Sequence, residues 1–191
     1  IMAGLDSQSS GTIKYDNNEF KTNWFGKIKQ NPEIKLAQLE SLPKVSKVSE
    51  VVKGISNQSV DQIYPKFLQR GSATSLLDRH VSDLSTGELY WLNMVSALES
   101  DPRVLMIDNY GIFSEKNMES KFRNKLRQMN KELGTTIVLA ASNDQNLITI
   151  ASVLIYLDNG HVSKVRTGVN KKPFRRSKPR KFNRTKKRSI R

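Results

Sequence analysis

Two apolar segments of this chain each end in polar side chains that could bind a ligand or take part in catalysis. Asp108 and Asn109 come directly after the run 104–107, and Ser142 and Asn143 come after the run 136–141. In an α/β protein the carboxyl ends of parallel strands form the edge of the sheet at which ligands bind. We therefore expect these four side chains at a ligand-binding edge, with Asp108 as a candidate marker of a nucleotide site.

Each candidate residue also has a structural explanation that needs no ligand. Asp108 could cap the helix that follows it, and Asn143 with Asp144 could form a turn. Ser85, with Glu88 three positions later, is the pattern of a helix N-cap in which both side chains satisfy free amides. The order of the elements, rather than any single residue, favours a ligand site. A capped helix, a turn with proline, a strand ending in aspartate, a long helix and a strand ending in Ser-Asn-Asp follow one another.

The hydropathy pattern predicts an α/β fold. Continuous apolar runs alternate with amphipathic segments, which is typical of a mainly parallel sheet covered by helices on both faces. Expected strands lie at 11–16, 33–38, 104–108, 136–141 and 153–157; expected helices lie at 47–77 (in short pieces), 86–99, 115–133 and 145–150; and Asn159-Gly160 should form a hairpin turn.

Composition excludes several classes of protein and restricts the meaning of the charge. The absence of Cys excludes a disulfide framework, a thiol nucleophile and Cys-based metal sites. No apolar run reaches the ~18 residues that a bilayer span needs. The net charge of +14 comes from 32 Lys and Arg against 18 Asp and Glu, and residues 169–191 hold twelve of the cations and no acid. Subtraction leaves 20 cations and 18 acids in residues 1–168, so the sequence predicts a near-neutral globule with a disordered basic tail.

In order and spacing these motifs resemble the nucleotide-binding subunit of the ABC (ATP-binding cassette) ATPases. Residues 84–88, Leu-Ser-Thr-Gly-Glu, match the family signature Leu-Ser-Gly-Gly-Gln at three of five positions. Val104 to Asn109 matches the Walker B strand, Gln38 stands at the Q-loop glutamine, and Asn143 stands at the H-loop. The resemblance extends over about residues 1–165.

The resemblance implies a P-loop NTPase-like fold, a mainly parallel sheet flanked by helices, with an inserted helical subdomain. The implied domains are a partial nucleotide-binding core with the Q-loop at 1–45, a helical subdomain with the signature motif at 46–100, a core with the Walker B and H-loop regions at 101–168, and the disordered basic tail at 169–191.

The resemblance also implies a ligand and a role for each matching residue. The expected cofactors are ATP and Mg²⁺. Gln38 and Asp108 would reach Mg²⁺ through water. The implied nucleotide-binding residues are Gln38, Ser85, Gly87, Glu88 and Asp108, of which Ser85 and Gly87 would face the phosphates held by a partner subunit.

Three departures from the family pattern bear on catalysis. The P-loop motif Gly-x-x-x-x-Gly-Lys-[Ser/Thr] does not occur, and the sequence begins just past its expected position, as in an N-terminally truncated cassette. Asn109 stands where the family has the glutamate that orients or deprotonates the attacking water, and Asn143 replaces the H-loop histidine that contacts the γ-phosphate. A lost general base typically costs about 10²–10⁴-fold in rate. At these degenerate catalytic positions we expect hydrolysis to be impaired.

Several functions remain open at this stage. The first is an ATP-binding subunit of a transporter, paired with a second nucleotide-binding subunit and transmembrane permeases, and peripheral at the cytoplasmic face of the cell membrane. The second is a non-hydrolysing regulatory or scaffold protein, and the third is an ABC-type protein that acts on ribosomes or nucleic acid. The tail at 169–191 could be a solvated end, could bind anionic lipid, or could bind RNA with Phe174 and Phe182 as stacking groups.

Overall fold

The structure is a computed structural model of the chain, and it describes residues 1–38, 42–55, 76–112 and 116–168. The chain divides into two compact units, Ile1–Ile150 and a second that begins at Ala151. The predicted helical pieces within 56–75 and the basic tail lie outside the described residues. None of the helices in the described ranges combines the length and apolarity that a bilayer span requires.

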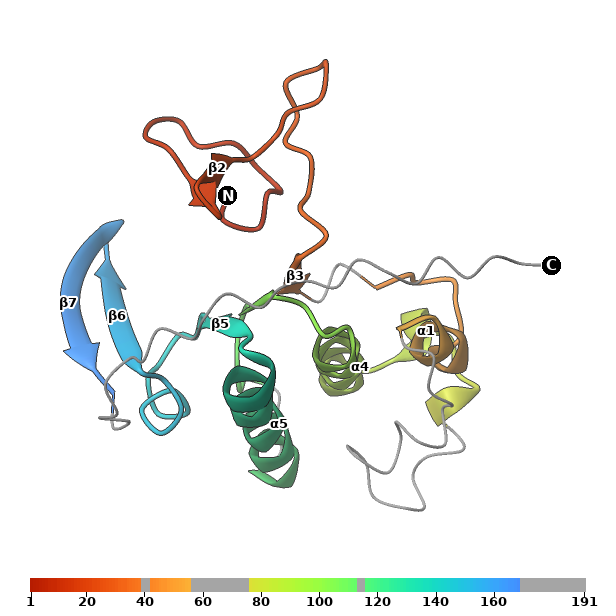
Figure 1. Cartoon of the computed structure of the whole chain (residues 1–191). Coiled ribbons are helices and arrows are strands. Elements are labelled where there is room, and N and C mark those ends of the chain that lie inside the picture. The colour runs from red at the N-terminus through yellow and green to blue at the C-terminus, as the bar shows by residue number, and fades with distance from the viewer. Residues whose placement is uncertain (39–41, 56–75, 113–115, 169–191) are drawn as a thin grey trace. The chain divides into compact units, whose positions relative to one another are not determined.

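A three-stranded parallel sheet forms the centre of the first unit. Its order is β3 (Ile34–Ala37), β4 (Val104–Ile107) and β5 (Thr136–Leu139). Ala37 lies opposite Ile107, and Ile107 lies opposite Leu139. The predicted strands at 33–38, 104–108 and 136–141 are thus confirmed, and so is the α/β fold with a parallel sheet (Figure 1).

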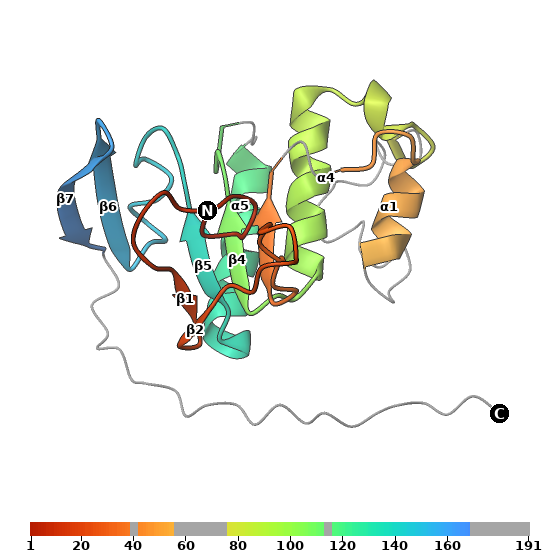
Figure 2. The same ribbon diagram turned by 90° about the horizontal axis from the view of Figure 1, so that it is seen from above.

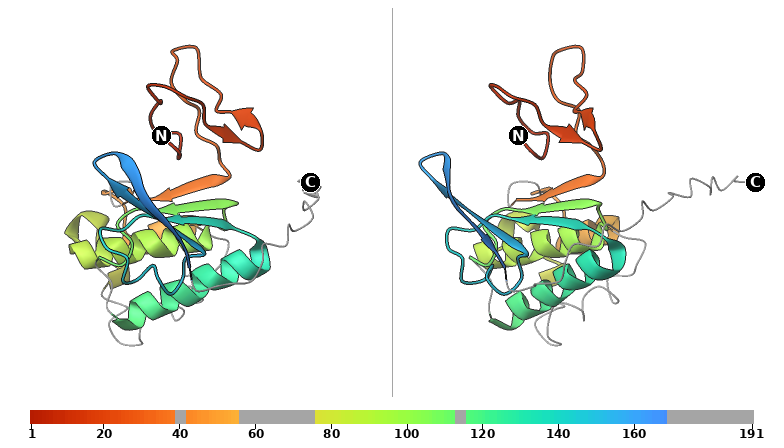
Figure 3. Two further views of the ribbon diagram at one scale, coloured as in Figure 1. Left: turned by 90° about the vertical axis from the view of Figure 1, so that its left-hand side faces the viewer. Right: turned by 60° about the vertical axis from the view of Figure 1, so that its left-hand side comes forward.

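Two helices cover one face of this sheet, as Figures 1 and 3 show. They are α4 (Thr86–Glu99) and α5 (Lys116–Gln128), which continues as a π-helical turn, η3 (Met129–Leu133). Beneath them Leu105 and Ile107 are almost completely buried. On the opposite face Val138 is 37% exposed. The helices of the described part of the chain therefore cover one face, not the two that the apolar runs predicted.

The remaining helical segments of the first unit lie beside α4. They are α1 (Val48–Ile55) and a short 3₁₀ turn, η2 (Val81–Asp83). α1 buries Val48 and Val52 and contacts α4, as the spacing of its valines predicted. Figure 2 shows α1 and α4 lying next to each other, with β4 and β5 beyond α4.

Two predicted elements of the first unit differ in the structure. The strand expected at 11–16 is shorter, β1 (Lys14–Tyr15), and it is followed by a turn at Asp16 and Asn17 as the sequence predicts. Both turn residues adopt left-handed backbone angles, and β1 pairs with β2 (Asn18–Glu19) in a tight hairpin. The helix expected at 145–150 is wrong. The Leu147 and Ile148 amides both donate to the Asp144 carbonyl at 2.9 Å, which closes turns without continuing into a helix.

The second unit contains a two-stranded antiparallel hairpin. β6 (Val153–Asp158) pairs with β7 (His161–Thr167) through a turn in which Asn159 and Gly160 have φ angles of 45° and 79°, as the Asn-Gly pair predicted. The expectation that the run 153–157 is buried in the parallel sheet is wrong. Successive strand residues face opposite sides, so Leu154 is buried while Val153 and Ile155 are 54% and 61% exposed.

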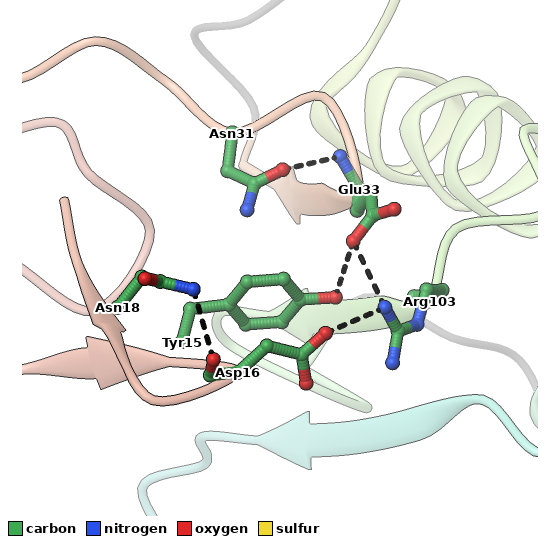
Figure 4. Close-up of polar contacts among 6 residues, drawn as sticks. All are labelled: Tyr15, Asp16, Asn18, Asn31, Glu33 and Arg103. Atoms are coloured by element: carbon green, nitrogen blue, oxygen red, sulfur yellow. Dashed lines mark hydrogen bonds and ion pairs between the residues drawn. The ribbon is translucent and has the colours of Figure 1, made fainter. Parts of the chain in front are cut away.

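A polar cluster ties the β1–β2 hairpin to the start of the parallel sheet (Figure 4). We call Tyr15, Asp16, Glu33 and Arg103 the Arg103 cluster. The Tyr15 hydroxyl donates to Glu33 Oε2 at 2.7 Å, and Arg103 Nη1 donates to Asp16 Oδ2 at 2.8 Å and to Glu33 Oε2 at 3.2 Å. The Arg103 guanidinium also lies 5.6 Å from the centre of the Tyr15 ring. Arg103 directly precedes β4, so the cluster lies at the end of the sheet away from Asp108.

We predict that Arg103→Ala lowers the free energy of unfolding by about 1 kcal/mol. The Arg103 side chain is half exposed, so each of its two ion pairs is worth only a few tenths of a kcal/mol after screening by water, and the ring contact adds a similar amount. Urea unfolding followed by circular dichroism measures the change. Arg166→Ala, which removes an exposed arginine of β7, is the matched control and should have no such effect. Equal stability of the two variants would contradict the prediction.

We also predict that the protein loses stability as the pH rises between about 10 and about 12. Burial, followed by the hydrogen bond to Glu33, raises the pKa of Tyr15 from 10.0 to about 12. Between these values the folded state keeps a proton that the unfolded chain releases, so a rise in pH favours unfolding. Absorbance titration of the phenolate in wild type and Tyr15→Phe tests this. A Tyr15 that ionises at its ordinary pKa would contradict it.

Candidate functional site

The parallel register brings the ends of three strands to one edge. The Asp108 amide donates to the Ala37 carbonyl at 3.2 Å, and the Ala140 amide donates to the Ile107 carbonyl at 2.9 Å. These bonds continue the ladder one residue beyond the strands. Gln38, Asp108 and Ala140 are therefore neighbours along the edge, which places the two residues that the resemblance assigns to Mg²⁺ side by side.

The turn after β4 carries Asp108 and Asn109, the two polar residues that follow the apolar run 104–107. Asp108 and Asn109 are both exposed, and Asp108 Oδ1 accepts the Asn109 amide at 2.9 Å. Asn109 has a φ of 54° and Gly111 a φ of 82°, so the backbone reverses sharply here. The Tyr110 amide donates to the Ala140 carbonyl at 2.8 Å, which fastens the turn to the end of β5.

A buried network of two tyrosines holds this turn from below. The Gly111 amide donates to the Tyr90 hydroxyl of α4 at 3.0 Å, and the Tyr110 hydroxyl donates to Glu119 Oε1 of α5 at 3.1 Å. Tyr90 and Tyr110 are both 2% exposed. Burial, followed by the nearby Glu119 carboxylate, raises the pKa of Tyr110 well above its ordinary value. Sequence reasoning missed this network, because nothing in the spacing pairs position 90 with position 111.

The loop that carries Asn143 packs against the same turn. Asn143 is exposed, and its Oδ1 accepts the Gln145 amide at 3.2 Å. This contact is that of a turn-forming asparagine, as the structural explanation predicts. A Cβ added to Gly111 would lie 2.3 Å from Asn146 Nδ2. The positive φ of Gly111 favours glycine at this position, and a larger residue would also have to move the Asn146 side chain.

The signature-like segment forms the start of α4. Ser85 is the N-cap: its hydroxyl accepts the Glu88 amide at 3.4 Å, while Glu88 Oε2 accepts the Ser85 amide at 2.8 Å. Arg79 Nη1 donates to Glu88 Oε1 at 2.8 Å. Burial works against ionisation of Glu88, but hydrogen bonds from Ser85 and the charge of Arg79 together lower the pKa of this carboxyl.

This geometry confirms the capping pattern predicted from the sequence, and it leaves two backbone amides that the helix does not use. In a capping box the amides at the first two helical positions, here those of Thr86 and Gly87, are not used by the helix. They lie at the positive end of the helix dipole, which favours anions. Ser85, Gly87 and Glu88 therefore form a second candidate group, separate in sequence from the strand-edge group of Gln38, Asp108 and Asn109.

The residues at the strand edge suit Mg²⁺ but would hold it through few direct bonds. In the described ranges no three His, Cys, Asp or Glu side chains gather in the way a metal ion requires. Asp108 offers one exposed carboxylate and Gln38 an amide oxygen. Mg²⁺ prefers oxygen ligands and usually keeps several waters beside one or two carboxylates and phosphate oxygens. The Asp108 carboxylate and the Gln38 amide oxygen match this preference.

The fold defines the class of protein: an α/β protein whose parallel sheet and helices are similar to those of P-loop NTPases of known structure. The model of the ABC transporter family matches residues 1–110, more than half of the sequence. The chain belongs to this family.

Individual relatives are distant and longer. The chain is 28% identical to the methionine import ATP-binding protein MetN 1 of Acinetobacter baylyi over 171 residues, which cover 83% of this chain and 47% of the relative. It is 22% identical to the spermidine/putrescine import ATP-binding protein PotA of Spiroplasma citri over 172 residues, which cover 87% of this chain and 49% of the relative. The chain thus spans about half the length of these relatives.

A solved structure shares the fold. It is the dimeric ATP-binding cassette MJ0796 in a post-hydrolysis state with ADP and Pi, which superposes with a TM-score of 0.66 at 17% identity over 86% of this chain and 76% of that one.

We predict that Tyr90→Phe destabilises the protein by about 1 kcal/mol, because it leaves the part-buried Gly111 amide without its acceptor. Met94→Leu, a change of similar volume at a fully buried position of the same helix, is the control and removes no hydrogen bond. Thermal unfolding and hydrogen exchange at Gly111 measure the effect. If the Gly111 amide exchanges no faster in Tyr90→Phe than in the control, the bond does not hold the turn.

Proposed function

We propose that this chain acts in the ATP-binding subunit of an ABC transporter complex, which couples ATP binding to transport by membrane-spanning partners. The observation that carries the proposal is the position of Gln38 beside Asp108 at the carboxyl edge of the parallel sheet. Membership of the ABC transporter family and the names of the import proteins it resembles support it. In this proposal the membrane-spanning partners determine the transported substrate, so we assign no substrate to this chain.

In this proposal each residue at the strand edge has a binding role. Asp108 and Gln38 orient Mg²⁺ through water, and Mg²⁺ when bound neutralises charge on the phosphate oxygens of ATP. The Tyr90 and Ala140 contacts keep the turn, and with it Asp108, in place. Asn109 directly follows Asp108 and Asn143 lies in the loop after β5, and in this proposal they are the degenerate catalytic positions.

The phosphates themselves need a cradle that the 191 residues do not contain, because no Gly-x-x-x-x-Gly-Lys motif is present. We assign the start of α4 to an ATP whose phosphates are held by the P-loop of a second nucleotide-binding subunit. Ser85 and Gly87 would then donate across the dimer interface, with Glu88 fixing the cap. The dimeric form of the structurally similar cassette supports this arrangement.

The permease partners would dock on the helical segment at about 46–83 and at the Gln38 region. The ATP-binding subunit would lie at the cytoplasmic face of the membrane, held there by these partners. The basic tail at 169–191 would add attraction to anionic headgroups, since each cation near such a surface adds about 1 kcal/mol.

The two asparagines favour a second candidate function, a non-hydrolysing ABC-like regulatory or scaffold protein. Neither amide can accept the proton of an attacking water, so both candidates share impaired hydrolysis and differ in whether transport depends on this chain. In the second candidate the tail at 169–191 would bind anionic lipid or RNA as the main contact.

We predict that phosphate release from the full-length protein, alone and with its partner subunits, is slow, and that Asn109→Glu raises it by about 10²-fold because a general base is restored. Asp158→Glu, a charge-conserving change in the second unit, is the control and should leave the rate unchanged. Wild-type turnover at the rates of ordinary ABC ATPases would contradict impaired hydrolysis.

The binding role has its own test. On titration with Mg²⁺ and ATP, the amide resonances of Gln38, Asp108 and Asn109 should shift, and Asp108→Asn should weaken the response. Asp158→Asn is the matched control. Titration that moves none of these resonances, with or without the partner subunits, would contradict the proposed nucleotide site.

A further inference from the structure

Two aromatic side chains stand almost fully in solvent at the end of a loop. Trp24 is 97% exposed and Phe25 is 85% exposed, more than any other large hydrophobic side chain in the described ranges except Val45, at 87%. Figures 1 and 3 show the segment between β2 and β3 rising to a narrow loop. We call Trp24 and Phe25 the aromatic tip. Leaving two aromatic rings in water is costly, so such a pair marks a surface that is buried in some other state.

The backbone of the loop is closed without any help from the aromatic rings. Asn23 Oδ1 accepts the amides of Phe25 and Lys27, each at 3.0 Å, and the Asn23 amide donates to the Lys27 carbonyl at 2.8 Å. A bridge between Thr22 and Ile28 continues the hairpin. The tip is therefore presented on a preorganised turn, and its side chains can be changed without unfolding the loop.

The charge around the tip has one sign. Lys21, Lys27 and Lys29 are exposed on the two arms of the loop, and residues 20–30 contain no acid. The nearest acid, Glu19, is exposed in β2 two positions before Lys21 and offsets one of the three lysine charges. The next acids along the chain, Asp16 and Glu33, are paired with Arg103. The loop thus combines a projecting apolar end with a cationic collar.

We propose that the aromatic tip inserts into the interface of a bilayer that contains anionic lipids, with the three lysines on the headgroups. Aromatic rings favour the headgroup region, and lysines near it are attracted to a negative surface. A nucleic acid is the less suitable partner, because base stacking needs a platform along a groove, whereas these rings form a convex end. This contact is separate from the basic tail and does not depend on the proposed nucleotide site.

The experiment uses the full chain, vesicles of phosphatidylcholine with and without phosphatidylglycerol, and tryptophan fluorescence. The chain has two tryptophans, and Trp91 is 2% exposed, so it gives a constant background while Trp24 reports on the tip. Anionic vesicles should shift the Trp24 emission to shorter wavelength, and lipids brominated near the headgroup should quench it. Trp24→Phe gives the Trp91 background.

Variants separate the tip from the tail. Trp24→Ser with Phe25→Ser should weaken partition by about tenfold or more and abolish the part that persists at high salt, where attraction of the tail is screened. Val45→Ser removes an equally exposed but isolated apolar side chain and is the matched control. Lys27→Gln with Lys29→Gln should weaken binding to anionic vesicles roughly fivefold per lysine and leave binding to neutral ones unchanged.

Four results would overturn the proposal. The first is that the wild type and the Trp24→Ser, Phe25→Ser variant partition equally onto anionic vesicles, and the second is that Trp24 in the free protein emits like a buried ring. The third is that single-stranded RNA, and not vesicles, quenches Trp24. The fourth is that the protein self-associates in sedimentation and the double serine variant abolishes this self-association. If Asp108→Asn loses nucleotide binding but Trp24 emission still shifts with anionic vesicles, the membrane proposal stands. The two proposals therefore fail independently.

Discussion

The parallel hydrogen-bond ladder through β3, β4 and β5 is the constraint on which the candidate site depends. Because Ala37 and Ile107 share one register position, the next residues, Gln38 and Asp108, must emerge side by side at the same edge. A slip of one residue would turn each side chain to the other face of the sheet. The burial of Leu105 and Ile107 under the helices prevents such a slip. The core thus sets the geometry of the edge.

The features that the sequence predicts correctly are those that depend on local patterns of residues. The apolar run before Asp108, the cap at Ser85 and the Asn-Gly turn each depend on a few neighbouring residues, and all three appear in the structure as expected. β6 was misjudged because a continuous apolar run does not reveal whether one or both faces are buried. The contact between Tyr90 and Gly111 joins residues 21 positions apart, and only the packing of α4 on the turn creates it.

The distribution of charge shows why a single net value misleads. Several acids in the described ranges pair with nearby cations, as Asp16 and Glu33 pair with Arg103 at the start of the sheet. The excess charge lies in the sequence at 169–191 and, on a smaller scale, around the aromatic tip. A near-neutral fold can therefore carry local surfaces with a strong preference for anions, and such surfaces say little about the chemistry at the strand edge.

The conformation of the turn after β4 gives the asparagine at position 109 a structural meaning. Its φ of 54° lies in the left-handed region, which asparagine tolerates better than other residues with a side chain beyond Cβ. Tyr110 and Gly111 are then fixed by bonds to Ala140 and Tyr90. A glutamate at 109 would carry some backbone strain in this conformation, which is why the gain expected from Asn109→Glu lies at the lower end of the about 10²–10⁴-fold range of a general base. Asparagine, the left-handed turn and the buried tyrosines are mutually consistent, and together they fix the turn that presents Asp108 at the strand edge.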